Sequence, residues 1–142
     1  MDRPEMEIAG YDAIEFHVGN ARQAAHFYRT GFGFRPIAYA GPETGVRDRV
    51  SYVLEQRGVR FVLTAGLTPD HPICRWQLRH GDGIRDVAFR VPDASTAFAL
   101  AIERGAVPVR APEVLTDEHG KLEVATIAAY GDTVHSFVRR ED

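Results

Sequence analysis

Five side chains in this sequence combine residue types that do chemistry with positions on strand-like segments. They are Glu15, His17, Asp86, Arg90 and His135. Carboxylates and imidazoles serve as general acids, general bases or metal ligands, and an arginine can bind a carboxylate through two hydrogen bonds. These residue types therefore indicate either a metal site or a pocket for a small organic acid.

Alternation along a strand decides which of these side chains share a face. Residues two or four apart point to the same face, so Glu15 shares a face with His17, two residues on, and Asp86 shares a face with Arg90, four residues on. A second interpretation needs no chemistry, because charges on a buried face are stabilised when they pair with one another. In that interpretation these residues and His135 form a buried ion-pair network.

The elements that must position these residues occur twice. IEFHVGNARQA (residues 14–24) and VAFRVPDASTA (residues 87–97) superpose at an offset of 73 residues, which is 87 minus 14. Each copy opens with alternating apolar residues, which predict a strand. Asn20 and Asp93 come next, and both residue types are favoured helix N-caps. A helix is therefore expected after each strand.

Glycines mark the expected helix ends. The first helix is expected to run to about Thr30, before Gly31 and Gly33, and the second to Arg104, with Gly105 in the left-handed cap position. Three strand-like runs follow each helix, namely PIAYAG, RVSYVLEQ and VRFVLTAG, then PVRAP, LEVATIAAY and TVHSFVRR. Each copy is thus predicted to be a βαβββ module.

The repeat extends over nearly the whole chain and predicts one domain of residues 1–142. Module one is expected at about residues 10–67, a linker at about 68–83, and module two at about 84–140. The linker is expected to hold a short helix from Arg75 to His80, before two glycines.

Paired βαβββ modules with a V-x-[ND] corner between strand and helix resemble the vicinal-oxygen-chelate superfamily, which includes glyoxalases, antibiotic-resistance proteins and ring-cleaving dioxygenases. The resemblance implies an α+β fold in which the modules form a cupped, mostly antiparallel, eight-stranded open barrel. FHVGNARQAAHFYRTGFGF, HGDGIRDVAF and YGDTVHSFV are similar, in this order, to stretches of the N-terminal domain of 4-hydroxyphenylpyruvate dioxygenases and hydroxymandelate synthases.

The resemblance also implies where a metal would lie, at one residue of the first and one of the last strand of each module. The repeat offset places these positions at Ala13, Val62, Asp86 and His135. Only Asp86 and His135 can ligate, whereas a protein Fe(II) or Zn(II) site normally takes at least three protein ligands. In the two-domain dioxygenases the iron belongs to the C-terminal domain, so no catalytic residue is carried over.

Three functions remain open. The first is an N-terminal-type domain of a 4-hydroxyphenylpyruvate dioxygenase, active in aromatic 2-oxo acid metabolism with a catalytic-domain partner and without an intact iron site of its own. The second is non-catalytic binding of a small aromatic or acidic molecule in the cupped sheet. The third is a stand-alone metalloenzyme whose ligands come from Glu15, His17, Asp86 and His135, with Fe(II) or another divalent metal as cofactor.

Composition narrows the partners and the compartment. Against 20 acidic residues there are 17 lysines and arginines, a net charge of −3, which gives no electrostatic basis for binding nucleic acid or an anionic membrane. One cysteine and an N-terminus without an apolar signal segment predict a cytoplasmic protein, and the open sheet predicts a homodimer. Cys74 is expected to be buried as a small apolar side chain. Surface or capping positions are expected for the remaining histidines, which are His26, His71, His80 and His119.

Overall fold

The computed structural model describes residues 5–141, which contain three α-helices, one short 3-10 helix and eight strands. None of the described helices combines the length and the apolar character that a membrane crossing requires. In chain order the elements are β1 (Gly10–His17), α1 (Ala21–Phe32), β2 (Arg35–Ala40), the 3-10 helix (Pro42–Thr44), β3 (Arg49–Gln56), β4 (Val59–Gly66), α2 (Pro72–His80), β5 (Gly83–Arg90), α3 (Ala94–Glu103), β6 (Pro108–Asp117), β7 (Gly120–Ala128) and β8 (Val134–Glu141).

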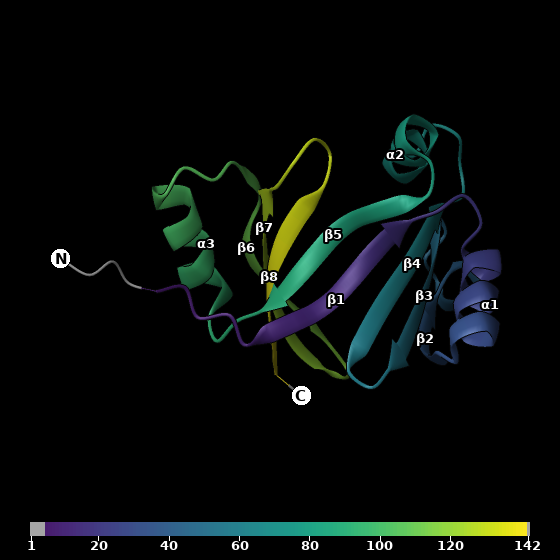
Figure 1. The fold of residues 1–142 in the computed structure, drawn as a ribbon, viewed down its shortest axis with the longest axis horizontal. Helices are drawn as coiled ribbons and strands as arrows, with labels where there is room; N and C mark the ends of the chain where they lie inside the picture. Colours follow the sequence, from purple (N-terminus) through teal and green to yellow (C-terminus); the bar gives the residue numbers. More distant parts are fainter. Residues whose placement is uncertain (1–4, 142) are drawn as a thin grey trace. The chain divides into compact units, whose positions relative to one another are not determined.

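The chain divides into two compact units. The first unit comprises residues 13–85, and the second comprises the described residues 5–12 and 86–141. The strand order is β2-β3-β4-β1 in the first unit and β5-β8-β7-β6 in the second (Figure 1). In each unit the first and last strands are parallel and the other two pairs are antiparallel. The predicted repeat of two βαβββ modules is confirmed.

The unit bounds differ from the expected modules because of two contacts. The linker helix α2 packs on β4 and belongs to the first unit. Residues 5–12 go with the second unit, where the backbone N–H of Ala9 donates to the carbonyl of Arg90 over 2.8 Å. There the Asp12 carboxylate also accepts hydrogen bonds of 2.8 and 2.9 Å from Arg140.

Both predicted N-caps are confirmed. The side-chain oxygen of Asn20 accepts from the backbone N–H of Gln23 over 3.0 Å at the start of α1. The carboxylate of Asp93 accepts from the backbone N–H of Thr96 over 2.9 Å at the start of α3. Each cap satisfies one of the free backbone donors in the first turn of its helix.

The C-terminal end of α1 and the start of α2 differ from the predictions. Helix α1 continues through Gly31 to Phe32, because the residue that adopts the left-handed conformation is Gly33, at φ 79°. Helix α2 begins at Pro72, earlier than the predicted Arg75. A proline fits the first helical turn because that turn leaves its backbone N–H groups without intrahelical partners.

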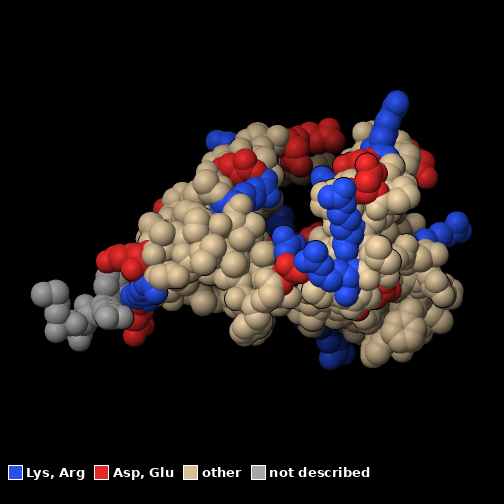
Figure 2. Space-filling view, turned by 90° about the horizontal axis from the view of Figure 1, so that it is seen from above, with Lys and Arg blue, Asp and Glu red and all other residues tan. Residues whose placement is uncertain are grey.

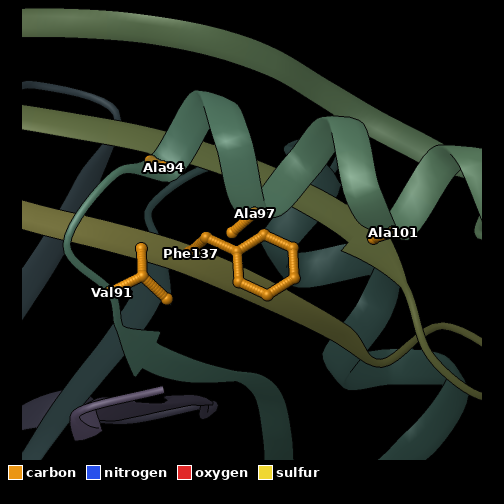
Figure 3. Packing of buried hydrophobic residues seen from close by; sticks show 5 residues of the cluster. All are labelled: Val91, Ala94, Ala97, Ala101 and Phe137. Atoms are coloured by element: carbon orange, nitrogen blue, oxygen red, sulfur yellow. The ribbon is translucent and has the colours of Figure 1, made fainter. Parts of the chain in front are cut away.

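Each unit buries one face of its sheet under a helix. In the first unit a cluster of Ala25, Phe34, Leu54 and Leu63 joins α1 to β3 and β4. In the second unit the small side chains of α3 let the helix lie close to the sheet, against the ring of Phe137 (Figure 3); that cluster comprises Val91, Ala94, Ala97, Ala101 and Phe137. This burial decides which side chains of each strand point away from the helix.

Charged side chains of both signs are exposed on the face of the molecule that Figure 2 shows. On the face shown in Figure 2, lysine and arginine side chains lie among aspartates and glutamates. This agrees with the near balance of 17 basic and 20 acidic residues in the sequence.

Candidate functional site

Glu15 and His17 lie on the face of the first-unit sheet that points away from α1. Between them Phe16 packs toward α1 with Tyr28 and Phe61, so its two neighbours point the other way. The predicted shared face of Glu15 and His17 is confirmed.

A chain of hydroxyls holds the carboxylate of Glu15. The Thr64 hydroxyl donates to Oε2 of Glu15 over 3.2 Å, and the Ser51 hydroxyl lies 2.9 Å from that of Thr64. Because a hydroxyl has one proton to donate, Ser51 is the donor to Thr64. Thr64 is only 2% exposed, so the chain runs through the buried centre of the sheet from β3 to β1.

His17 is buried beside this chain. It is 7% exposed, and its ring meets Trp76 of α2 edge to face with 5.4 Å between ring centroids. Its Nε2 lies 3.6 Å from Oε1 of Glu15, which is longer than a normal hydrogen bond. Its Nδ1 is buried and makes no hydrogen bond to any described atom. The first unit therefore places an imidazole and a carboxylate side by side, with one ring nitrogen unsatisfied.

The second unit builds a similar chain around Asp86. One carboxylate oxygen of Asp86 accepts from the backbone N–H of Ser136 over 3.0 Å, and the other accepts from its hydroxyl over 2.5 Å. The hydroxyls of Ser136 and Thr126 are 2.8 Å apart, so Thr126 is the donor in that pair. Ser136 and Thr126 are 5% and 6% exposed. Both units thus hold a first-strand carboxylate with a pair of hydroxyls from their last two strands, and of these four hydroxyl residues only Ser51 is half-buried while the others are buried.

His135 lies on the opposite face of the second-unit sheet from Asp86. In the parallel pair of β5 and β8, Asp86 is the partner of Val134, and Val87 is the partner of His135. The ring of His135 packs against Phe89, with 5.0 Å between ring centroids, and its Nδ1 donates to the Val87 carbonyl over 3.0 Å. The prediction that Asp86 and His135 form a metal-binding pair is wrong.

The length of one turn explains this error. Two residues connect β3 to β4, whereas five residues, Ala129 to Thr133, connect β7 to β8. Residue 14 pairs with 61 in the first unit and 87 with 135 in the second, so the last strands are offset by 74, which is 135 minus 61. The structural counterpart of Val62 is therefore Ser136. A shift of one residue moves a side chain to the other face of a strand.

The residues of the second unit do not fit an iron or zinc site at the positions that the resemblance implies. Asp86 and His135 cannot converge on one ion from opposite faces, and Ser136 already donates to both carboxylate oxygens of Asp86. Within residues 5–141 no group of three or more His, Cys, Asp or Glu side chains is arranged to hold a metal. The predicted ion-pair network is also wrong for Arg90, whose side chain is exposed to solvent.

The remaining histidines include one helix cap. Nδ1 of His71 accepts from the backbone N–H of Ile73 over 3.1 Å, so Nε2 carries the proton and donates to Asp48 over 3.0 Å. That hydrogen bond holds the pKa of Asp48 below its usual value. The ring of His80 contacts Trp76, and His119 is exposed in a turn. The capping or surface roles predicted for His71 and His119 are confirmed.

Sequence reasoning missed the four hydroxyls that hold the two carboxylates. A signal was present, because each is a serine or threonine inside an otherwise apolar strand segment; the four are Ser51, Thr64, Thr126 and Ser136. A hydroxyl on the buried face of a strand needs a hydrogen-bond partner. Its presence in such a segment therefore points to a polar neighbour across the sheet.

Comparison with known proteins identifies the family. The model of the hydroxyphenylpyruvate dioxygenase N-terminal family matches residues 2–142. The chain belongs to this family. A probable 4-hydroxyphenylpyruvate dioxygenase 2 of Aspergillus fumigatus is 42% identical, over 96% of this chain and 39% of its own length. The 4-hydroxyphenylpyruvate dioxygenase of Xenopus tropicalis is 45% identical, over 88% of this chain and 32% of its own. This chain thus spans less than two fifths of the length of either relative.

Solved structures agree with this assignment. A triple mutant of 4-hydroxymandelate synthase from Streptomyces coelicolor superposes with a TM-score of 0.84 and 37% identity, covering 95% of this chain and 38% of that one. Methylmalonyl-CoA epimerase from Mycobacterium tuberculosis superposes with a TM-score of 0.78 over 99% of this chain and 94% of that one, at 16% identity. The second likeness bears on the fold alone and supports the vicinal-oxygen-chelate architecture.

Proposed function

We propose that this chain acts as the N-terminal-type domain of a 4-hydroxyphenylpyruvate dioxygenase system in aromatic 2-oxo acid metabolism. In this proposal the oxygen chemistry takes place on iron in a separate catalytic domain, on this or another polypeptide. The family match over residues 2–142 is the observation that carries the proposal. Relatives with 42 and 45% identity bear the dioxygenase name, and this chain covers about a third of their length.

The two hydroxyl chains support a structural role for the acidic residues in this proposal. Glu15 and Asp86 accept hydrogen bonds from the neighbouring strand, and each links the first strand of its unit to the last. A hydrogen bond to a charged acceptor contributes about 1.5–3 kcal/mol. We infer that these carboxylates rigidify the sheets, while substrate turnover depends on residues outside this chain.

A chimaera tests the proposal directly. Residues 2–142 would replace the matching segment of the Xenopus tropicalis dioxygenase, and the conversion of 4-hydroxyphenylpyruvate would be measured with bound iron. We expect the chimaera to bind iron and turn over the substrate, and the chain alone, supplied with Fe(II), to show no turnover. A folded, iron-loaded chimaera without activity contradicts the proposal, as does turnover by the chain alone.

The stand-alone metalloenzyme is tested separately by elemental analysis of the chain purified without chelators. Under the proposed function His135→Ala and Asp86→Asn leave the metal content unchanged, because neither side chain ligates. A stoichiometric metal that either substitution removes would contradict this. The small-molecule-binding alternative, the homodimer and the cytoplasmic location stay predictions.

A further inference from the structure

A pocket lies between α1 and β2 in the first unit, on the outer side of the sheet. Its volume is about 500 Å³, within the range of about 300–1,000 Å³ that is typical of small-molecule sites. β2 is the last strand on this side of the described sheet, and most of its residues are exposed. The lining residues are Arg22, Ala25, His26, Arg29, Pro36, Ile37, Ala38, Tyr39, Tyr52 and Leu54.

One wall of this pocket is basic. Arg22, His26 and Arg29 are four and three residues apart on α1, so they project from one face of the helix. Among the described residues none of the three forms an ion pair or a side-chain hydrogen bond, and all three are exposed. No acidic residue occurs in α1 or in the pocket lining. Two guanidinium groups and an imidazole therefore face the pocket as unengaged donors.

The floor and the opposite wall are apolar and aromatic. Leu54 is fully buried beneath the pocket, and the rings of Tyr39 and Tyr52 pack with 5.0 Å between their centroids. The Tyr39 hydroxyl donates to Glu43 over 2.6 Å, and this bond raises the pKa of Tyr39 to about 12. Glu43 is thereby engaged at the β2 side. The pocket is therefore basic on its α1 side and aromatic on its β2 side.

The second unit provides an internal comparison. At the repeat offset of 73 residues, Arg22 corresponds to Ser95, His26 to Ala99 and Arg29 to Ile102. The helix of the second unit thus carries none of the three basic groups. A βαβββ unit folds in this chain without them, so the basic wall is a property of the first unit and is not required by the fold.

We propose that this pocket binds a small amphipathic anion, an aromatic ring bearing a carboxylate or a phosphate. Arginine binds both groups through paired hydrogen bonds, and the tyrosine-lined floor accepts a flat ring. The site lies on the α1 side of the first-unit sheet, whereas Glu15 points to the opposite face of that sheet and Asp86 belongs to the second unit. It goes beyond the proposed function and does not depend on dioxygenase activity.

Matched ligands test the proposal by NMR. The 15N-labelled full chain would be titrated with 3-phenylpropanoate, with its neutral isostere 3-phenylpropanamide, and with phenyl phosphate. We expect saturable amide shifts at α1, β2 and β3, and affinity about tenfold lower for the amide, because a lost charge-assisted hydrogen bond lowers affinity by about that factor. Whichever of 3-phenylpropanoate and phenyl phosphate binds with higher affinity indicates whether the site prefers a carboxylate or a phosphate.

Variants locate the anion. The double variant Arg22→Gln with Arg29→Gln is expected to weaken 3-phenylpropanoate binding about tenfold, whereas Arg75→Gln on α2, also exposed, leaves it unchanged. Equal affinity for acid and amide, absence of saturable shifts with both anions, or shifts confined to other strands overturns the proposal. If the double variant does not fold, the acid and amide comparison on the wild-type chain decides. Chimaera activity is measured independently, so either proposal can fail alone.

Discussion

Ser136 stands between two other polar residues at the centre of the second-unit sheet. It donates its hydroxyl proton to Asp86 and accepts one from Thr126. A half-buried carboxylate that loses a donor from inside the sheet is destabilised, because water does not fully replace the lost hydrogen bond. Ser136, which is 5% exposed, thus holds the carboxylate of Asp86 from within the sheet.

Replacement of this hydroxyl is the first prediction. Ser136→Ala is expected to lower the free energy of unfolding by about 1–3 kcal/mol, because Asp86 loses its shortest hydrogen bond. Urea unfolding followed by circular dichroism measures the effect. Thr116→Ala, at an exposed position on β6, serves as the control and is expected to change stability by less than about 0.5 kcal/mol. Equal effects of the two substitutions would refute the structural role of the hydroxyl pair that holds Asp86.

At the scale of elements, the two N-caps differ in whether they ionise. The backbone N–H of Thr96 lowers the pKa of Asp93 below its ordinary value of 3.8, whereas Asn20 caps α1 with a neutral amide. A lowered folded-state pKa means that the stabilisation is fully present above pH 3.8 and is lost as the pH falls through the folded pKa. Asp93→Asn keeps a capping oxygen and removes this part of the pH dependence.

Unfolding in urea at about pH 7 and about pH 3 measures that difference. The loss of stability on acidification is expected to be smaller in Asp93→Asn than in the wild type. Asn20→Ala provides the comparison: it is expected to destabilise by about 1 kcal/mol, equally at both pH values. An unchanged acid dependence in Asp93→Asn would show that the cap does not contribute to it.

The close contact of β4 with α2 requires a glycine at position 66. A Cβ at Gly66 would lie 2.6 Å from Sγ of Cys74 and 3.3 Å from its backbone nitrogen. Gly66→Ala is therefore expected to destabilise by about 1–3 kcal/mol through overpacking. Adding Cys74→Ala removes the sulfur and is expected to recover part of the loss in thermal melts. A double variant no more stable than Gly66→Ala would mean that the clash is with the backbone.

At the scale of the whole molecule, one ion pair joins residues 128 positions apart. Asp12 is 4% exposed and accepts two hydrogen bonds from Arg140 of β8, which ties residues 5–12 to the second unit. Arg140→Gln is expected to destabilise by about 1–3 kcal/mol. The Arg140 side chain is 42% exposed, which places the effect toward the lower end of that range. Hydrogen exchange of residues 9–12 and urea unfolding measure it.

The neighbouring arginine is a matched control. Arg139 pairs with Glu141 over 2.7 Å, and both side chains are more than two fifths exposed. Such surface pairs contribute about 0–1 kcal/mol, so Arg139→Gln is expected to have the smaller effect. If both substitutions lower the free energy of unfolding equally, the ion pair between buried Asp12 and Arg140 contributes no more to stability than a surface ion pair.

Features set by neighbouring residues were predictable from sequence. The two copies of strand, N-cap and helix were found from Asn20, Asp93 and the apolar alternation before them, because capping and alternation act over a few residues at fixed spacing. The face shared by Glu15 and His17 follows from the same alternation. The predicted ranges of β3 and β4 agree with the structure to the residue.

Only the tertiary structure decided how distant strands are registered. The longer turn before β8 shifts that strand by one residue against β5, which moves His135 to the helix side and places Ser136 beside Asp86. Sequence spacing cannot supply this, because register depends on loop length and on packing of the buried face. The chemistry-bearing residue types were therefore readable from the sequence by itself, whereas the pairing of Asp86 with a hydroxyl in place of an imidazole was decided by the fold.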